Sequence, residues 1–320
     1  MVDLSKLKSL AEWHSHRAGI ENSILKLVGR PPKERVETQV KTMDEADFPR
    51  YTRKRVNYFV DEWTRVTAWL FVPHLKEEMP AVLCCHSRAP QGKDEMAGLK
   101  APSPAAFAQL FAERGYVTLA PDCITAGERV SSRAEPFHSE NFYKEYPKSS
   151  LIGKMLSDHV YGLDMLSEMN HVDNARMAVI GHGLGGTNAL LLAAFDERIA
   201  ACVASNAFTR LETDKNLERW YDDGGMCLIP GLRGVSAESL DFDWEHVLAL
   251  AAPTAILVLT ALSGASYCNP RSCQKAVTHA ARVYKMLGAS PAIEHFGHHD
   301  GNAVTHASVE LAEDWFDRWV

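Results

Sequence analysis

The chain has 320 residues, of which 46% are hydrophobic and 23% are charged. These are ordinary values for a globular protein, and they exclude a collagen-like, coiled-coil or wholly disordered chain. The formal net charge is −7 and there is no block of basic residues, which argues against nucleic-acid binding.

Neither the N-terminal segment nor the longest apolar stretch indicates secretion or membrane insertion. The N-terminal segment MVDLSKLKSLAEW has no apolar core, so we expect no signal peptide. The longest apolar stretch, Leu248 to Leu262, is interrupted by Pro253 and is too short to span a bilayer. The seven cysteines are scattered, without a CxxC pair or zinc-ligand spacing. We therefore expect reduced, mostly buried thiols in a cytoplasmic protein.

Residues 1–50 differ from the rest of the chain. They are polar and end in a charged stretch between Pro31 and Pro49, which predicts a helical N-terminal extension followed by a linker. Residues 55–60 and 65–72 then predict a β-hairpin, because apolar residues alternate along the second of the two segments.

Beyond the hairpin, strand and helix patterns alternate, which predicts one α/β domain over residues 51–320. The expected strands and helices are, in chain order, 81–86, 103–115 (helix), 116–122, 155–169 (helix), 177–180, 187–195 (helix), 201–205, 255–259, 276–287 (helix), 292–296 and 309–319 (helix). Such alternation predicts right-handed crossovers and a mostly parallel central sheet with helices on both faces. Functional residues then gather in the loops that follow the carboxyl ends of the strands.

A glycine cluster, GHGLGG at residues 181–186, joins a predicted strand to a predicted helix. One interpretation is the strand-to-helix turn of serine hydrolases, G-x-S-x-G, with Gly183 in the place of the nucleophile. Another is the dinucleotide fingerprint G-x-G-x-x-G. The following strand ends in Ser205 and Asn206, without the acid that the fingerprint needs. A turn with no chemical role stays open as a third interpretation.

From about Tyr51 onward, the chain resembles the α/β-hydrolase superfamily, in particular its dienelactone hydrolase and acetyl xylan esterase-like group. The resemblance rests on the segments PAVLCCHSRAPQGKDEMAGL, FAERGYVTLAPDCITAGER, VDNARMAVIGHGLGG, DERIAACVAS and EDWFDRW, which follow one another in the expected order. It implies an α/β-hydrolase fold, and a serine, an acid and a histidine as the catalytic triad.

Two of the three triad positions are vacant by this resemblance. Gly183 replaces the serine, and Gly264, with Ala265 as the neighbouring option, replaces the acid. No Asp or Glu occurs between Ala249 and Pro291. The histidine remains, as His298 or His299. One vacancy alone would fit an engineered knock-out, whereas the second favours natural divergence.

The loss of the nucleophile is chemically large. Removing it from a serine triad costs on the order of a millionfold in turnover, about 8 kcal/mol of transition-state stabilisation. Backbone donors of the oxyanion hole could persist, and the candidates are the amides of Leu184 and of Ser87 or Arg88. Without an orienting acid, His298 or His299 would be a freer general base.

Further candidates carry alternative interpretations. Cys123, just after a strand, is a substitute nucleophile or simply a buried thiol. His182 contributes to binding or packs, and Glu128 with Arg129 lies near the substrate cavity or forms a loop ion pair. The histidines around residues 295–299 are spaced too compactly for a metal site. A cap over the pocket is expected at residues 209–242.

Three functions remain open on this reading. The first is an α/β-hydrolase of carboxylic-ester hydrolase lineage that is inactive or diverged. The second is a lyase, isomerase or cyclase that uses a histidine base and a backbone oxyanion hole. The third is a non-catalytic small-molecule binder. We expect no cofactor or metal, a small-molecule substrate or ligand, no nucleic-acid or membrane partner, and a homodimer as one assembly to test.

Overall fold

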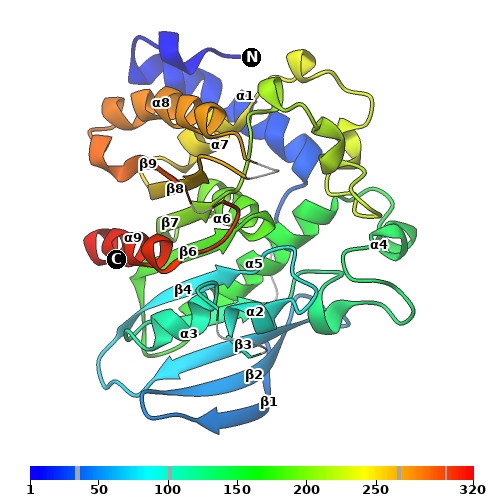
Figure 1. Ribbon diagram of the computed structural model, residues 1–320, viewed down its shortest axis with the longest axis vertical. Coiled ribbons are helices and arrows are strands. Elements are labelled where there is room, and N and C mark those ends of the chain that lie inside the picture. Colours follow the sequence, from blue (N-terminus) through cyan, green and yellow to red (C-terminus); the bar gives the residue numbers. More distant parts are fainter. Residues whose placement is uncertain (33–36, 100–102, 265–267, 300) are drawn as a thin grey trace.

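The computed structural model describes the chain except for residues 33–36, 100–102, 265–267 and 300 (Figure 1). Its strands form one sheet of nine, in the order β1-β2-β3-β5-β4-β6-β7-β8-β9. The strands are β1 Val40–Asp47, β2 Tyr51–Phe59, β3 Arg65–Pro73, β4 Met79–Cys85, β5 Val117–Pro121, β6 Val172–His182, β7 Ile199–Ser205, β8 Ala255–Ala261 and β9 Ile293–His298.

The sheet changes character at β5. Strands β1, β2 and β3 pair antiparallel, and β3 also pairs antiparallel with β5. Every pairing from β5 through β4 and β6 to β9 is parallel. The predicted mostly parallel sheet is therefore confirmed, and the carboxyl ends of β4 to β9 meet at one edge.

Helices cover both faces of this sheet, as predicted. The helices are α1 Leu10–Val28, α2 Lys93–Met96, α3 Phe107–Ala112, α4 Glu140–Glu145, α5 Leu151–Ser167, α6 Leu184–Phe195, α7 Trp244–Ala251, α8 Pro270–Met286 and α9 His306–Trp319. Helices α5, α6, α7 and α8 contact one another in sequence and form one layer. Helices α3 and α9 lie together on the sheet through the rings of Phe111 and Phe316, whose centroids are 5.1 Å apart.

The N-terminal 50 residues are not only a helix and a linker. Helix α1 is present and packs on α7 and α8, near the β8–β9 end of the sheet (Figure 1). Residues 40–47, expected as linker, form strand β1 along the edge of β2. The strand was missed because its side chains are almost all exposed, so no apolar alternation marks it.

The expected cap segment, residues 209–242, is ordered by short 3₁₀ turns rather than by long helices. These turns are Leu211–Thr213, Leu217–Trp220, Pro230–Leu232 and Ala237–Ser239. Buried apolar side chains such as Trp220 and Leu232 tie the segment to the core. Within the described residues, no helix has the length and apolar character needed to cross a membrane.

Candidate active site

Gly183 occupies the turn between β6 and α6. Its backbone has φ 55° and ψ −119°, a conformation that residues other than glycine adopt only with strain. Its amide donates to the Ser205 carbonyl oxygen at 2.8 Å, which ties the turn to the end of β7. A Cβ at this position would meet no atom within 4 Å. The turn therefore presents only backbone to the space in front of it.

The other glycines of the cluster have packing reasons. A Cβ on Gly181 would lie 2.2 Å from the Gly185 carbonyl carbon, and one on Gly185 would lie 2.0 Å from the Cys85 carbonyl oxygen. Both distances are far inside van der Waals contact. The glycine spacing thus follows from the close approach of β6, α6 and β4, which explains the cluster without a dinucleotide.

A small cavity opens in front of Gly183. Its volume is about 80 Å³, enough for roughly half a dozen water-sized molecules. Of the predicted site residues, Arg88, Gly183 and Leu184 line it. The other lining residues are Thr187, Asn206, Ala207, Arg219, Trp220, Asp223, Met226 and Leu228. Five of these eight come from residues 209–242, the segment expected as a cap.

Salt bridges hold the polar wall of the cavity. Arg88 binds Asp223 through Nη1 to Oδ2 at 2.5 Å and through Nη2 to the carbonyl oxygen at 2.9 Å. Arg219 binds Asp214 at 2.8 Å and lies over the Trp220 ring, 5.4 Å from its centroid. The loop after β4 is thereby fixed to the cap segment.

From the sequence, Asn206 served only to argue against a dinucleotide-binding motif and was not predicted as a site residue. It is buried, has a positive φ of 46°, and accepts a hydrogen bond on Oδ1 from the Ala261 amide at 2.8 Å. Its Nδ2 donor has no hydrogen-bond partner among the described residues. A buried amide donor on the cavity wall is thus available to a ligand oxygen.

The expected oxyanion donor at Ser87 is occupied by the chain itself. The Ser87 amide donates to Glu95 Oε2 at 2.9 Å, and the Ser87 hydroxyl donates to Oε1 of the same carboxylate at 2.9 Å. A carboxylate therefore lies where an oxyanion would need a free donor. Glu95, on α2, was not singled out from the sequence because no motif links it to Ser87.

The two histidines after β9 differ in placement. His298 is the last residue of β9 and is buried, whereas His299 is exposed. Asp300 lies outside the described residues. Of the two candidates, only His298 lies inside the molecule at the strand end.

His182, the last residue of β6, is held by two hydrogen bonds. Nε2 donates to the Asn302 carbonyl oxygen at 3.1 Å, so the remaining nitrogen, Nδ1, accepts from the Ser205 hydroxyl at 3.0 Å. Burial lowers the pKa of His182, which the nearby Glu95 raises and His298 lowers further.

The vacant acid position also lies in a turn with a positive φ. Gly264 has φ 75°, and a Cβ there would lie 3.7 Å from the Cα of Gly301, in the loop after β9. The loops after β8 and β9 therefore approach each other at this point. Ala265, the neighbouring option, lies outside the described residues.

The structure does not bring Cys123 to the cavity. Its side chain is buried, its amide donates to His86 Nε2 at 2.9 Å, and its sulfur lies 4.0 Å from His159 Nε2. His86 in turn donates from Nδ1 to the Ser87 carbonyl oxygen at 2.7 Å. Cys123 and His86 together connect the loops after β5 and β4.

Glu128 and Arg129 do not pair with each other, and each forms ion pairs with other residues. Glu128 binds Lys93 at 2.7 Å and Arg55 at 3.2 Å. Arg129 binds the buried Asp158 at 2.7 Å. Neither Glu128 nor Arg129 lines the cavity in front of Gly183.

No metal site is evident in the described part of the chain, where no three His, Cys, Asp or Glu side chains gather.

Comparison with known proteins finds similarity to hydrolases. The model of the dienelactone hydrolase family matches residues 68–217. YtaP of Bacillus subtilis (strain 168), which carries a provisional hydrolase name, is 27% identical over 252 residues, covering 74% of this chain and 78% of that protein.

Solved structures share the fold at low sequence identity. A glucuronoyl esterase from Solibacter usitatus superposes with a TM-score of 0.76 and 14% identity, over 97% of this chain and 94% of the other. An acetyl xylan esterase from Paenibacillus sp. R4 gives 0.62 and 17%, over 98% and 96%.

Proposed function

We propose that this chain, which has an α/β-hydrolase fold and matches the dienelactone hydrolase family model over residues 68–217, is a diverged hydrolase that binds a small carboxylic ligand without forming an acyl-enzyme. The observation that carries the proposal is the Gly183 turn, which keeps the backbone of the nucleophile position and offers no attacking oxygen. Glycine cannot attack a carbonyl carbon, so the covalent route is closed at its first step.

The occupied Ser87 amide supports the same proposal. In an ester hydrolase, this backbone position would help to stabilise the oxyanion of the tetrahedral intermediate. Here Glu95 accepts from that amide. An incoming oxyanion would meet a carboxylate, and like charges repel. The nucleophile position and the Ser87 amide are thus both unsuited to acyl transfer, whereas the amides of Leu184 and Arg88 remain candidate donors.

The cavity supports a ligand with acceptor oxygens. Asn206 offers a buried donor, Arg88 and Arg219 bring guanidinium groups to the wall, and Trp220 offers an aromatic surface. The volume of about 80 Å³ suits a group of a few heavy atoms. The similar solved structures are named for acetyl and glucuronoyl esters, and we therefore propose that the cavity holds acetate or the carboxylate end of a uronate.

Binding can be tested with acetate and D-glucuronate as probes, by isothermal titration calorimetry. Asn206→Asp keeps the acceptor for the Ala261 amide and removes the Nδ2 donor. We expect the affinity of the better probe to fall at least tenfold, because a donor is replaced by a second negative oxygen. Asn216→Asp, an exposed asparagine of the cap segment, is the control and should bind normally. Equal affinity in both variants would contradict the proposed role of Asn206.

Loss of the acyl-enzyme route is tested with p-nitrophenyl acetate. The unmodified chain should hydrolyse it near the background rate. Gly183→Ser alone should stay near background, whereas Gly183→Ser with Gly264→Asp and Glu95→Ala should gain measurable hydrolysis. Rapid turnover by the unmodified chain, with an acyl group found on one of its side chains, would contradict the proposal.

A second candidate is a base-catalysed reaction without a covalent intermediate, such as a lyase or isomerase step. The buried position of His298, close enough to His182 to act on it electrostatically, favours it, since a histidine held inside the molecule can serve as a general base. His298→Ala should abolish such a reaction and leave probe binding unchanged. His299→Ala, at an exposed position, should affect neither.

A further inference from the structure

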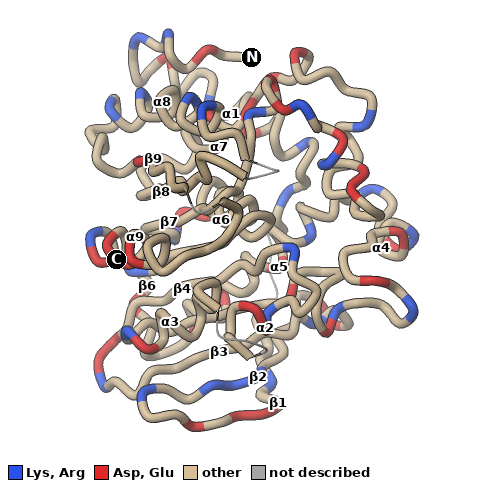
Figure 2. The backbone as a smooth tube through the Cα atoms, viewed as in Figure 1, with Lys and Arg blue, Asp and Glu red and all other residues tan. Residues whose placement is uncertain are grey.

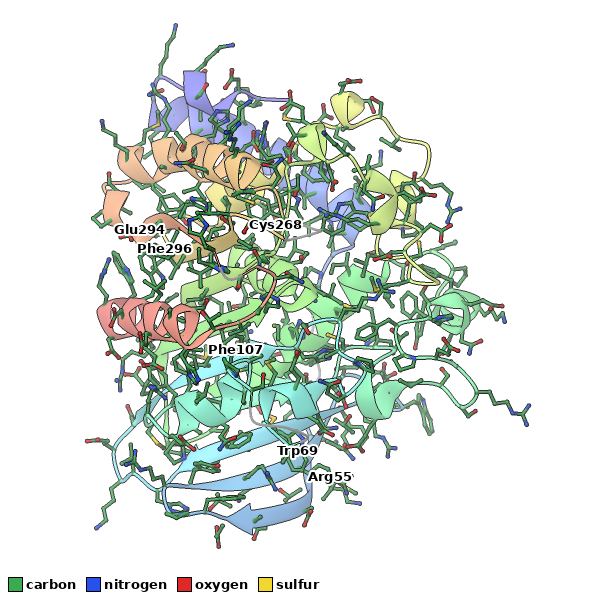
Figure 3. The ribbon with its side chains drawn as sticks, in the orientation of Figure 1. Arg55, Trp69, Phe107, Cys268, Glu294 and Phe296 are labelled. Carbon is green, nitrogen blue, oxygen red and sulfur yellow. The ribbon has the colours of Figure 1, made fainter. Side chains whose placement is uncertain are left out.

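Two cysteines at the start of α8 lie side by side. The sulfurs of Cys268 and Cys273 are 3.3 Å apart, and both side chains are buried. A disulfide bond is about 2.05 Å long, so the sulfurs need to approach by only about 1 Å. Cys268 is labelled in Figure 3.

The surrounding hydrogen bonds hold this pair in place. Cys273 Sγ donates to the Phe208 carbonyl oxygen at 3.0 Å, and the Cys273 amide donates to the Asn269 carbonyl oxygen at 2.9 Å. The Asn269 amide donates to Thr209 Oγ1 at 2.9 Å, and its side chain caps α8 by accepting from the Ser272 amide. The start of α8 is therefore fixed against the segment that follows β7, and the two sulfurs stay near each other.

The pair also lies close to the cavity wall. Arg219, which lines the cavity, is near enough to Cys273 to act on its thiol electrostatically. Phe208 and Thr209, which contact Cys273 and Asn269, directly follow the lining residues Asn206 and Ala207. A covalent bond at this point would join the loop before α8 to the helix directly behind the cap segment.

We propose that Cys268 and Cys273 are a redox modification site that forms a reversible disulfide by exchange with a low-molecular-weight disulfide such as oxidised glutathione. The Cys268 thiolate attacks one glutathione sulfur and releases one glutathione thiolate. Cys273 then loses its proton, attacks the Cys268 sulfur and expels the second. Two protein thiols are oxidised, and one small disulfide is reduced to two thiols.

Cys268 is assigned the first step because of access. It is 6% exposed, whereas Cys273 is 0% exposed. The proposal does not depend on the ligand or reaction of the Gly183 cavity.

The test is a tryptic map under non-reducing conditions after incubation with oxidised glutathione. Trypsin cleaves after Arg271, between the two cysteines, so the disulfide joins two peptides that are otherwise separate: residues 234–271 and residues 272–275. We expect the joined peptide after oxidation and its disappearance after reduction. Both peptides staying separate, in protein that circular dichroism shows to be folded, would overturn the proposal.

Single variants test the order of the steps. In Cys273→Ser, Cys268 has no resolving thiol, and we expect a stable glutathione adduct on Cys268. In Cys268→Ser, Cys273 is buried and we expect no adduct. Cys227→Ser, at a half-buried cysteine outside the pair, is the control and should form the joined peptide like the unmodified chain. An adduct confined to Cys227 would contradict the assignment.

Discussion

A side chain at position 183 would be destabilising because of the backbone conformation there, since it would clash with no neighbouring atom. The open space around a Cβ there means that Gly183→Ser and Gly183→Ala should lose the same amount of stability, about 1–3 kcal/mol. Denaturant unfolding measures both. The control is Gly19→Ala, in helix α1, where a Cβ also meets open space and we expect a gain of about 0.5–1 kcal/mol. A more stable Gly183→Ser variant would contradict the strain.

His182 predicts a pH dependence of stability. Burial lowers its pKa in the folded state below the ordinary histidine value of 6.5. Above pH 6.5 the imidazole is neutral in both states. As the pH falls below 6.5, the unfolded chain takes up the proton first, so stability is lost until the folded-state pKa is reached. His182→Gln should flatten this part of the stability profile, as measured by urea unfolding at several pH values. His306→Gln, at an exposed position, should leave the profile unchanged.

At single positions, the sequence predicted the role of a residue only where a local motif marked it. Gly183 could be assigned to the turn because a strand, a glycine cluster and a helix follow one another. Glu95 could not, because its contact with Ser87 depends on the path of the loop after β4 and on the short helix α2. The free donor of Asn206 likewise depends on how three strand ends meet.

A buried ion-pair network connects α5 to the loop after β5. Asp158 binds Arg129 at 2.7 Å and also pairs with Lys154. Asp158→Asn would leave the buried Arg129 without its counter-ion, and we expect a loss of about 3–5 kcal/mol in unfolding free energy at neutral pH. Asp173→Asn removes a surface pair with Arg176 and should cost little. Similar losses in the two variants would show that burial does not matter here.

The same network predicts the acid limit of stability. Burial opposes ionisation of Asp158, but Arg129 and Lys154 outweigh it and lower the pKa of Asp158 below 3.8. Its contribution is therefore complete above pH 3.8 and is lost as the pH falls through the folded-state value. The Asn variant should lose less stability than the unmodified chain over this acid range.

Elements with a buried face were predictable, and exposed ones were not. Helix α5 and strand β8 have continuous buried positions that appear as apolar spacing in the sequence. Strand β1 forms by backbone pairing with β2 while its side chains face solvent. Its sequence, VKTMDEAD, therefore carries no alternation that distinguishes it from a charged linker.

Helix α1 belongs to the core of the whole molecule. Its buried side chains are those of Trp13, Ile20, Ile24, Leu25 and Val28. Each buried side chain of this size contributes about 1.5–3 kcal/mol, so together they match the whole stability of a typical domain, about 5–15 kcal/mol. We expect deletion of residues 1–29 to prevent folding, as measured by circular dichroism and gel filtration.

A graded version of this test uses single substitutions. Ile24→Ala, at a fully buried position, should cost about 2–5 kcal/mol. His14→Ala, on the exposed side of the same helix, should change stability little. A folded, monodisperse deletion product would show that the helix is an independent attachment.

For the molecule as a whole, the alternation of strands and helices was enough to predict the sheet and its two helical layers. The number of antiparallel strands at the β1 end was not, since only the hairpin of β2 and β3 carried a pattern. How the cap segment and the strand ends enclose a cavity depends on contacts between residues far apart in the chain.

Strand β1 leaves one long edge of the sheet open to solvent, with Val40 and Met43 exposed on it. Open edges of this kind recruit strands from other molecules and seed aggregation. Charges of both signs lie along β1 and β2 (Figure 2). Lys41, Asp44 and Glu45 must lose hydration if a second strand docks there, which opposes fibril-like growth from this side.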